Sequence, residues 1–192
     1  MRTLLFLLLI LVWSCTSGDN AEQDAAPVDP TFQQFLDQFP AVNLPLSIKG
    51  CVDRFEGLTF FDETNSSPFV EDYSFAFGQL ETKGAYKAVI TLTAADCLLP
   101  VLNTYQPDGT LIDRKTIAIG QCGTAPCFEC EEFMSMDLDL ALFTADTITT
   151  ATCDSNYQPI AGTEKVEVIY KKGKLLSTGK IELSASIKRA LD

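Results

Sequence analysis

The apolar residues of this chain change their spacing near residue 40, from a helical repeat to a strand repeat. Four aromatic or leucine positions recur every three or four residues before that point: Phe32, Phe35, Leu36 and Phe39. This spacing predicts a short helix over 31–39 that lies over the core. Thr31 is the expected cap and Pro40 the expected stop.

From Leu44 onward, short apolar runs alternate with turn residues, which is typical of strands. Three hairpins are predicted: 73–80 with 85–93 around Lys83-Gly84, 101–105 with 111–119 around Pro107-Asp108-Gly109, and 166–170 with 175–183 around Lys172-Gly173. Residues 134–142 alternate apolar and polar side chains, and 147–152 is their expected partner strand. The predicted fold is therefore mainly β: an antiparallel β-sandwich or barrel built from hairpins, with a short N-terminal helix.

The amino terminus has the layout of an export signal. The apolar run from Leu4 to Trp13 would make a helix of roughly 15 Å, about half the hydrocarbon layer of a membrane. The residues at its end, Val12, Trp13, Ser14 and Cys15, are similar to a bacterial lipobox, in which a small residue precedes a cysteine that is acylated and becomes the new amino terminus. Two or more acyl chains make a durable anchor. Because Trp13 is bulky for that motif, an ordinary signal peptidase cut nearby is the alternative.

These features divide the chain into three parts. Residues 1–14 are the expected lipoprotein signal peptide, 15–30 a flexible acidic tether with few apolar residues, and 31–192 a single mainly β domain. The net charge of −12 makes nucleic acid a poor partner. Residues 164–192 are locally basic, which suits a soluble edge hairpin or, alternatively, docking onto an acidic partner.

The chain contains no histidine, so any catalysis would rest on carboxylates, lysine or thiols. Asp137 and Asp139 are expected on one side of a strand, where they could hold calcium or act as an acid/base pair. Since they alternate with an apolar stripe, a solvated sheet face is the favoured interpretation. The acidic loop around residues 62–72 is likewise interpreted as solvated. No catalytic, cofactor-binding or metal-binding residue is therefore assigned, and no cofactor is expected.

Six cysteines follow Cys15, an even number that favours disulfides in an exported protein: Cys51, Cys97, Cys122, Cys127, Cys130 and Cys153. Spacing does not choose among the possible pairings, although the loop from Cys122 to Cys130 and Cys153 fall at neighbouring strand ends.

The sequence supports two other roles for the cysteines less well than disulfide bonding. Cys127 and Cys130 have the spacing of a thioredoxin-like redox pair, but the glutamates around them would raise the thiol pKa. A four-cysteine zinc site from Cys122, Cys127, Cys130 and Cys153 would compete with oxidation.

The lipobox-like start, the acidic tether, Gly78 and Gly84 in the 73–92 hairpin, and the 105–119 hairpin together resemble uncharacterised lipoproteins of Bacteroidetes. The resemblance implies an outer-membrane address, because Thr16 is not the aspartate associated with inner-membrane retention. The expected function is a non-catalytic, lipid-anchored envelope module that binds an envelope protein, a glycan or a small apolar ligand. The alternative is a carboxylate-dependent envelope enzyme that acts on glycans.

Overall fold

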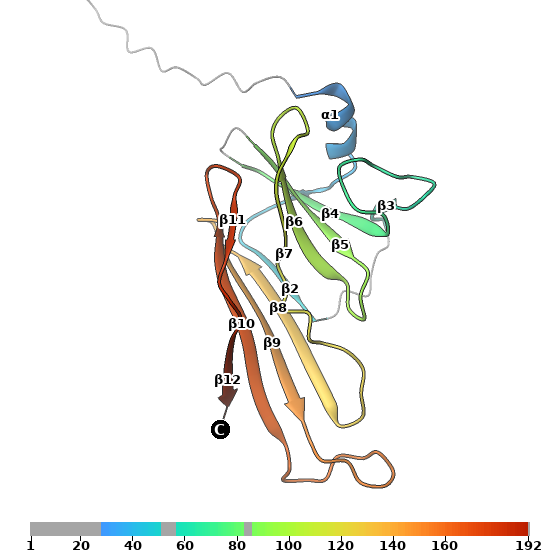
Figure 1. Cartoon of the computed structure of the whole chain (residues 1–192), viewed down its shortest axis with the longest axis vertical. Helices are drawn as coiled ribbons and strands as arrows, with labels where there is room; N and C mark the ends of the chain where they lie inside the picture. The colour runs from blue at the N-terminus through green and yellow to red at the C-terminus, as the bar shows by residue number, and fades with distance from the viewer. Residues whose placement is uncertain (1–27, 51–56, 83–85, 192) are drawn as a thin grey trace, which may run out of the picture.

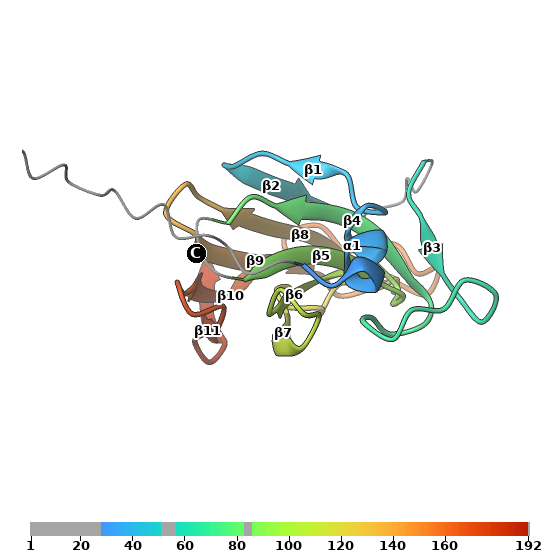
Figure 2. The ribbon, with the colours of Figure 1, turned by 90° about the horizontal axis from the view of Figure 1, so that it is seen from above.

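A computed structural model describes residues 28–50, 57–82 and 86–191 of the chain. Two mostly antiparallel sheets face each other and a short helix caps one end (Figures 1 and 2). The predicted mainly β sandwich is confirmed, and the sheets do not close into a barrel over the described residues. Within these residues, no helix is long and apolar enough to cross a membrane.

Each sheet has six strands. Sheet A contains β1 (Ala41–Val42), β3 (Phe60–Phe61), β4 (Ser74–Leu80), β5 (Lys87–Thr93), β6 (Leu99–Tyr105) and β7 (Leu111–Thr116). Sheet B contains β2 (Leu46–Lys49), β8 (Phe128–Met136), β9 (Ala141–Thr150), β10 (Lys165–Leu175), β11 (Ile181–Leu183) and β12 (Ile187–Leu191). The order is β1-β4-β5-β6-β7 in sheet A, with β3 on β4, and β11-β10-β9-β8-β2 in sheet B, with β12 on β10.

The main core fills the space between the sheets. Strand alternation sends every second side chain of β8 and β9 inward, so the methionines of the 134–142 stripe meet leucines and isoleucines of sheet A. The buried members of this core are Leu80, Tyr86, Ala88, Ile90, Leu102, Ile117, Met134, Met136, Leu142, Leu175 and Ile181.

The turn between β10 and β11 ties sheet B to sheet A. The Thr104 hydroxyl donates a hydrogen bond to the Gly179 carbonyl at 2.7 Å, and the Ile181 amide donates to Asp113 Oδ2 at 2.9 Å. Polar groups on both sheets are thus paired where the hairpin tip meets the edge of sheet A.

The outer face of sheet A is covered by α1 (Pro30–Leu36). Asp29 caps this helix, since its Oδ1 accepts from the amides of Thr31 and Phe32 at 2.9 and 3.1 Å. The cap is therefore Asp29 rather than the expected Thr31. Beneath the helix lies a second, largely aromatic core: Phe32, Phe35, Leu36, Phe39, Phe61, Val70, Ala76, Val89 and Tyr105.

Arg114 holds the segment between β3 and β4 onto the same face. Its Nε donates to Asn103 Oδ1 at 2.7 Å, and its two terminal nitrogens donate to the Phe69 carbonyl and to Glu71 Oε1 at 2.9 and 3.1 Å. One guanidinium thus connects β6 and β7 to a loop more than 40 residues away in sequence.

Two expectations about turns are wrong. β10 runs unbroken through Lys172 and Gly173, and the chain instead reverses at Gly179, whose φ is +81°. The 134–142 run is also interrupted, because Asp137 turns the chain between β8 and β9. The Pro107-Asp108-Gly109 turn is confirmed, with Gly109 at a φ of +87°. The paired strands β4 and β5 confirm the first hairpin, whereas its turn at 83–85 lies outside the described residues.

Candidate functional site

Two carboxylates lie buried between the sheets, directly opposite each other on neighbouring strands. Glu132 of β8 pairs in register with Asp146 of β9, and both are in phase with the inward-facing Met134. Glu132 is 6% exposed and Asp146 is fully buried. Three buried side-chain oxygens here have no hydrogen-bond partner: Glu132 Oε1, Asp146 Oδ1 and Thr144 Oγ1.

Burial dominates the titration of this pair. It raises the pKa of Glu132 to about 7, and the negative charge of Asp146 adds to that rise. Burial also raises the pKa of Asp146, opposed by the backbone amides of Gln121 and Cys122 and by the charge of Lys171. Two neighbouring carboxyl groups with raised pKa values favour a state that retains a proton at neutral pH.

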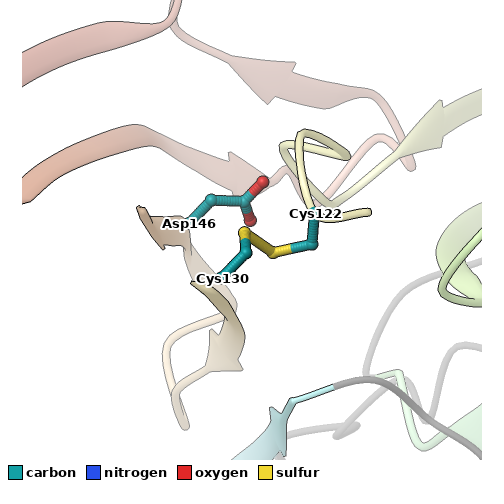
Figure 3. A group of neighbouring side chains, drawn as sticks. All are labelled: Cys122, Cys130 and Asp146. Atoms are coloured by element: carbon teal, nitrogen blue, oxygen red, sulfur yellow. A yellow bond between two sulfur atoms is a disulfide. The ribbon is translucent and has the colours of Figure 1, made fainter. Parts of the chain in front are cut away.

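The loop that crosses from sheet A to sheet B closes over the pair. The Gln121 amide donates to Asp146 Oδ2 at 2.7 Å, and Lys171 Nζ of β10 donates to the Ala118 carbonyl at 3.4 Å. A disulfide between Cys122 and Cys130 fixes the end of this loop to β8, with Cα atoms 5.2 Å apart. Figure 3 shows the Asp146 carboxylate pointing toward that disulfide.

The closest approach to a metal-binding group among the described residues is formed by Cys122, Cys130 and Asp146, whose ligand atoms lie within 4.8 Å of one another. Both sulfurs are bonded to each other and offer no thiolate, so this group does not fit a metal in the oxidised protein. The four-cysteine zinc hypothesis meets the same obstacle.

The second disulfide joins Cys127 to Cys153, with Cα atoms 5.8 Å apart. Cys127 and Cys130 therefore have different partners, and the thioredoxin-like pairing is wrong for this structure. Cys97 is also disulfide-bonded, while Cys51 and Cys15 lie outside the described residues. Disulfide bonding of the late cysteines is thus confirmed.

The other acidic candidates make local hydrogen bonds. Asp137 and Asp139 do not share a strand face, because Asp137 Oδ1 accepts from the amides of Asp139 and Ala141, both at 2.9 Å, and forms the β8–β9 turn. In the 62–72 loop, Asp62 accepts from the Thr64 amide at 2.8 Å. The hydrogen bond from the Thr64 hydroxyl, followed by those from the amides of Thr64 and Asn65, lowers the pKa of Asp62. These carboxylates stabilise turns rather than converge on a common site.

No helix or strand among the described residues packs on the outer face of sheet B, in contrast to that of sheet A, although the β9–β10 connection approaches one end of it at Glu129 and Thr149. Phe133, Phe143 and Tyr170 cross it on three neighbouring strands, with ring centroids 6.1 and 5.9 Å apart. Lys49 and Lys172 lie over two of these rings, 6.0 and 5.9 Å from the centroids of Phe133 and Tyr170. All three rings are only partly buried.

Aliphatic side chains continue this face across β10 and β12. Val166 and Val168 point outward with Tyr170, and their register partners on the edge strand include Leu191 and Ile187. Ile187 is 44% exposed and Leu191 45% exposed. At one end the face deepens into a groove of about 520 Å³, lined by residues that include Pro45, Leu46, Ser135, Met136, Phe143 and Lys172.

Sequence reasoning missed both the buried pair and the uncovered face. The pair could have been found by extending the apolar alternation two residues back from Met134, which places Glu132 on the inward side. Its partner Asp146 depends on the register between β8 and β9, which is known only from the structure.

Comparison of the chain with protein-family models, curated proteins and solved structures found no match.

Proposed function

We propose that this protein is a non-catalytic interaction module of a bacterial cell envelope, held at the outer membrane by acyl groups on Cys15. The observation that carries the proposal is the uncovered outer face of sheet B, with its aromatic row and adjoining groove. A contiguous exposed apolar patch on a soluble domain marks a surface that binds a partner.

Two features support the proposed membrane address: the sequence around Cys15 and the disulfides of the folded domain. The short apolar run before Cys15 is too short to remain as a membrane span, and the lipobox-like residues supply an acylation site. The disulfides Cys122–Cys130 and Cys127–Cys153 are stable in an oxidising compartment outside the cytosol.

A carboxylate-dependent enzyme is the second candidate, and one observation favours it. The pKa of Glu132, about 7, lies in the range of a general acid or base. Against it, Glu132 is 6% exposed and Asp146 is fully buried beneath the loop that carries Gln121, and neither residue lines the groove beside Phe143. Such an enzyme acting on glycans would lose its activity in Glu132→Gln.

The proposal is tested in cells that express the protein with a photo-crosslinking phenylalanine analogue at Phe143. We expect a discrete adduct from this position and none from Tyr157, an exposed tyrosine in the β9–β10 connection that serves as the control. Mass spectrometry of the same preparation should find acyl groups on Cys15. Absence of any adduct from positions 133, 143 and 170 would overturn the interaction role, and an unprocessed Met1 would overturn the address.

A further inference from the structure

We propose that reduction of the Cys122–Cys130 disulfide creates a zinc site, in which the two thiolates and the Asp146 carboxylate bind the ion. The site lies in the interior of the sandwich, so it depends neither on the outer face of sheet B nor on the membrane anchor. Its formation would exchange a covalent link between the crossing loop, residues 117–127, and β8 for a metal link.

The three ligand atoms are already close together. The Sγ atoms of Cys122 and Cys130 and a carboxylate oxygen of Asp146 lie within 4.8 Å of one another (Figure 3). Tetrahedral zinc, with Zn–S bonds of about 2.3 Å and a Zn–O bond of about 2.1 Å, separates its ligand atoms by roughly 3.6 to 3.8 Å. Once the S–S bond is broken, the two sulfurs can reach this separation by side-chain rotation, since their Cα atoms are 5.2 Å apart.

Strand pairing places two of the ligands on one face. Cys130 pairs in register with Ile148 and Glu132 with Asp146, so Cys130 and Asp146 are diagonal neighbours on β8 and β9. Both are in phase with the inward-facing side chains of these strands. The sheet itself therefore holds this thiol and this carboxylate together, whatever the state of the disulfide.

The third ligand is also held by contacts that involve no sulfur. The Gln121 amide donates a hydrogen bond to Asp146 Oδ2 at 2.7 Å, directly before Cys122 in the chain. Ile117, at the start of the crossing loop, is fully buried in the main core. Reduction of the disulfide therefore leaves Cys122 beside β8 and β9.

Asp146 has an oxygen available for an ion. The side chain is fully buried, and while Oδ2 accepts from the crossing loop, Oδ1 has no hydrogen-bond partner. A buried anionic oxygen without a partner is costly, and a cation or a proton satisfies it. Among the described residues, no such third ligand stands beside the other disulfide, Cys127–Cys153.

The charges of the reduced site balance when zinc is bound. Two thiolates and one carboxylate supply three negative charges, zinc supplies two positive charges, and Lys171, which interacts electrostatically with Asp146, supplies the third. Thiolates are soft ligands that select zinc over magnesium or calcium. The sulfurs of the disulfide carry no charge, so binding of the ion depends on the redox state of the pair.

The reductant is a dithiol, the chemical class that reduces protein disulfides by exchange. Its two thiols give two electrons and two protons to the Cys122–Cys130 bond, which becomes two thiols, and the dithiol itself becomes a disulfide. Zinc binding then releases both thiol protons, because only thiolates coordinate the ion. Both cysteines are partly exposed, so a dithiol can reach them.

The first test measures zinc binding to the full chain carrying Cys15→Ser, reduced anaerobically with a phosphine that has no thiol of its own. Native mass spectrometry counts bound zinc, and the absorption of bound cobalt(II) reports thiolate ligands. The reduced parent should bind zinc at least a hundredfold more tightly than the oxidised parent does. Cys122→Ser with Cys130→Ser should lose this ion, and the matched control Cys127→Ser with Cys153→Ser should keep it.

Asp146→Asn separates the proposed site from a site made by the thiolates alone, and it should weaken zinc binding at least tenfold. A second measurement needs no substitution at the site. Because zinc binds only the reduced form, free zinc at a hundredfold its Kd should raise the reduction equilibrium constant of Cys122–Cys130 about a hundredfold. This corresponds to about 59 mV for a two-electron couple. Alkylation and peptide mass spectrometry at a series of glutathione ratios measure it, and Cys127–Cys153 should not shift.

Three results would each overturn the inference. The first is a Cys122–Cys130 potential that zinc leaves unchanged. The second is zinc binding to Asp146→Asn as tight as to the parent. The third is retention of the ion by the variant that lacks both Cys122 and Cys130.

Discussion

Substitution of Glu132 by glutamine should make the protein more stable at alkaline pH and leave its stability in acid unchanged. The amide has nearly the shape of the carboxyl group but cannot ionise, so it removes the cost of placing a charge between the sheets. It also offers a hydrogen to Asp146 Oδ1, one of the buried oxygens without a partner.

The magnitude follows from the pKa of the buried carboxyl group. Folding raises the pKa of Glu132 from 4.5 to about 7, chiefly through burial. At about 1.4 kcal/mol per pKa unit, this shift corresponds to about 3 kcal/mol. The native state keeps the proton to higher pH than the unfolded chain does. The stability that the protonated Glu132 gives the parent protein is therefore fully present below pH 4.5. It is lost as the pH rises through about 7, and no further loss from this group occurs above that range.

The assay is equilibrium urea unfolding at pH 4, 6 and 8 with the disulfides intact. Glu132→Gln should match the parent at pH 4 and exceed it by about 3 kcal/mol at pH 8. The matched control is Glu131→Gln, which removes the same charge from the exposed side of the same strand and should change stability by less than about 0.5 kcal/mol. An equal difference between Glu132→Gln and the parent at pH 4 and pH 8 would show that folding does not raise the pKa of Glu132.

Three further substitutions test the packing described above. Phe32→Ala, which empties the centre of the aromatic core under α1, should cost about 3 to 5 kcal/mol in urea unfolding at neutral pH, and a cost below 1 kcal/mol would mean that the helix does not cover sheet A. Asp29→Ala should cost about 1 kcal/mol by the same measurement, whereas Asp29→Asn should cost little. Replacing both cysteines of Cys127–Cys153 by alanine should lower the free energy of unfolding by about 1 kcal/mol more than the same change at Cys122–Cys130. The reason is that the first disulfide closes a longer loop, 26 residues against 8. Equal losses of stability would contradict this account, in which a disulfide acts through the entropy of the closed loop.

Local patterns in the sequence predicted most of the strands, because turn residues and alternation act over a few neighbours. Pro107-Asp108-Gly109 is an example, since both its proline and its glycine have fixed roles in one turn. The turn predicted at Lys172-Gly173 is absent from the structure for a physical reason. Gly173 is needed inside β10, where a Cβ atom would lie 2.0 Å from the Glu182 carbonyl oxygen of β11. The sequence alone does not distinguish a glycine that is required for close strand packing from one that is required for a turn.

The prediction was wrong in the opposite way at Asp137, where the structure has a turn that the sequence pattern did not predict. Apolar alternation continued through it, with Leu138 in phase, and so favoured one long strand. In the structure Leu138 is 74% exposed, and the Asp137 carboxylate accepts hydrogen bonds from the amides of Asp139 and Ala141, which stabilise the turn. Hydrogen bonding of a side chain to its own backbone outweighed the hydrophobic pattern here.

The buried pair and the uncovered face share one origin, the alternation of side chains along β8. β8 presents alternate residues to opposite sides of sheet B, so Glu132 is sealed inside while Glu131 and Phe133 face outward. A polar residue on the inner side and an aromatic residue on the outer side are each unfavourable for a sandwich standing alone. The first becomes tolerable when a proton neutralises it, and the second when another surface covers it. Reversing the phase of β8 would expose Glu132 and bury Phe133 but would also expose Met134 and Met136, so the main core fixes a register that leaves both residues in need of a partner.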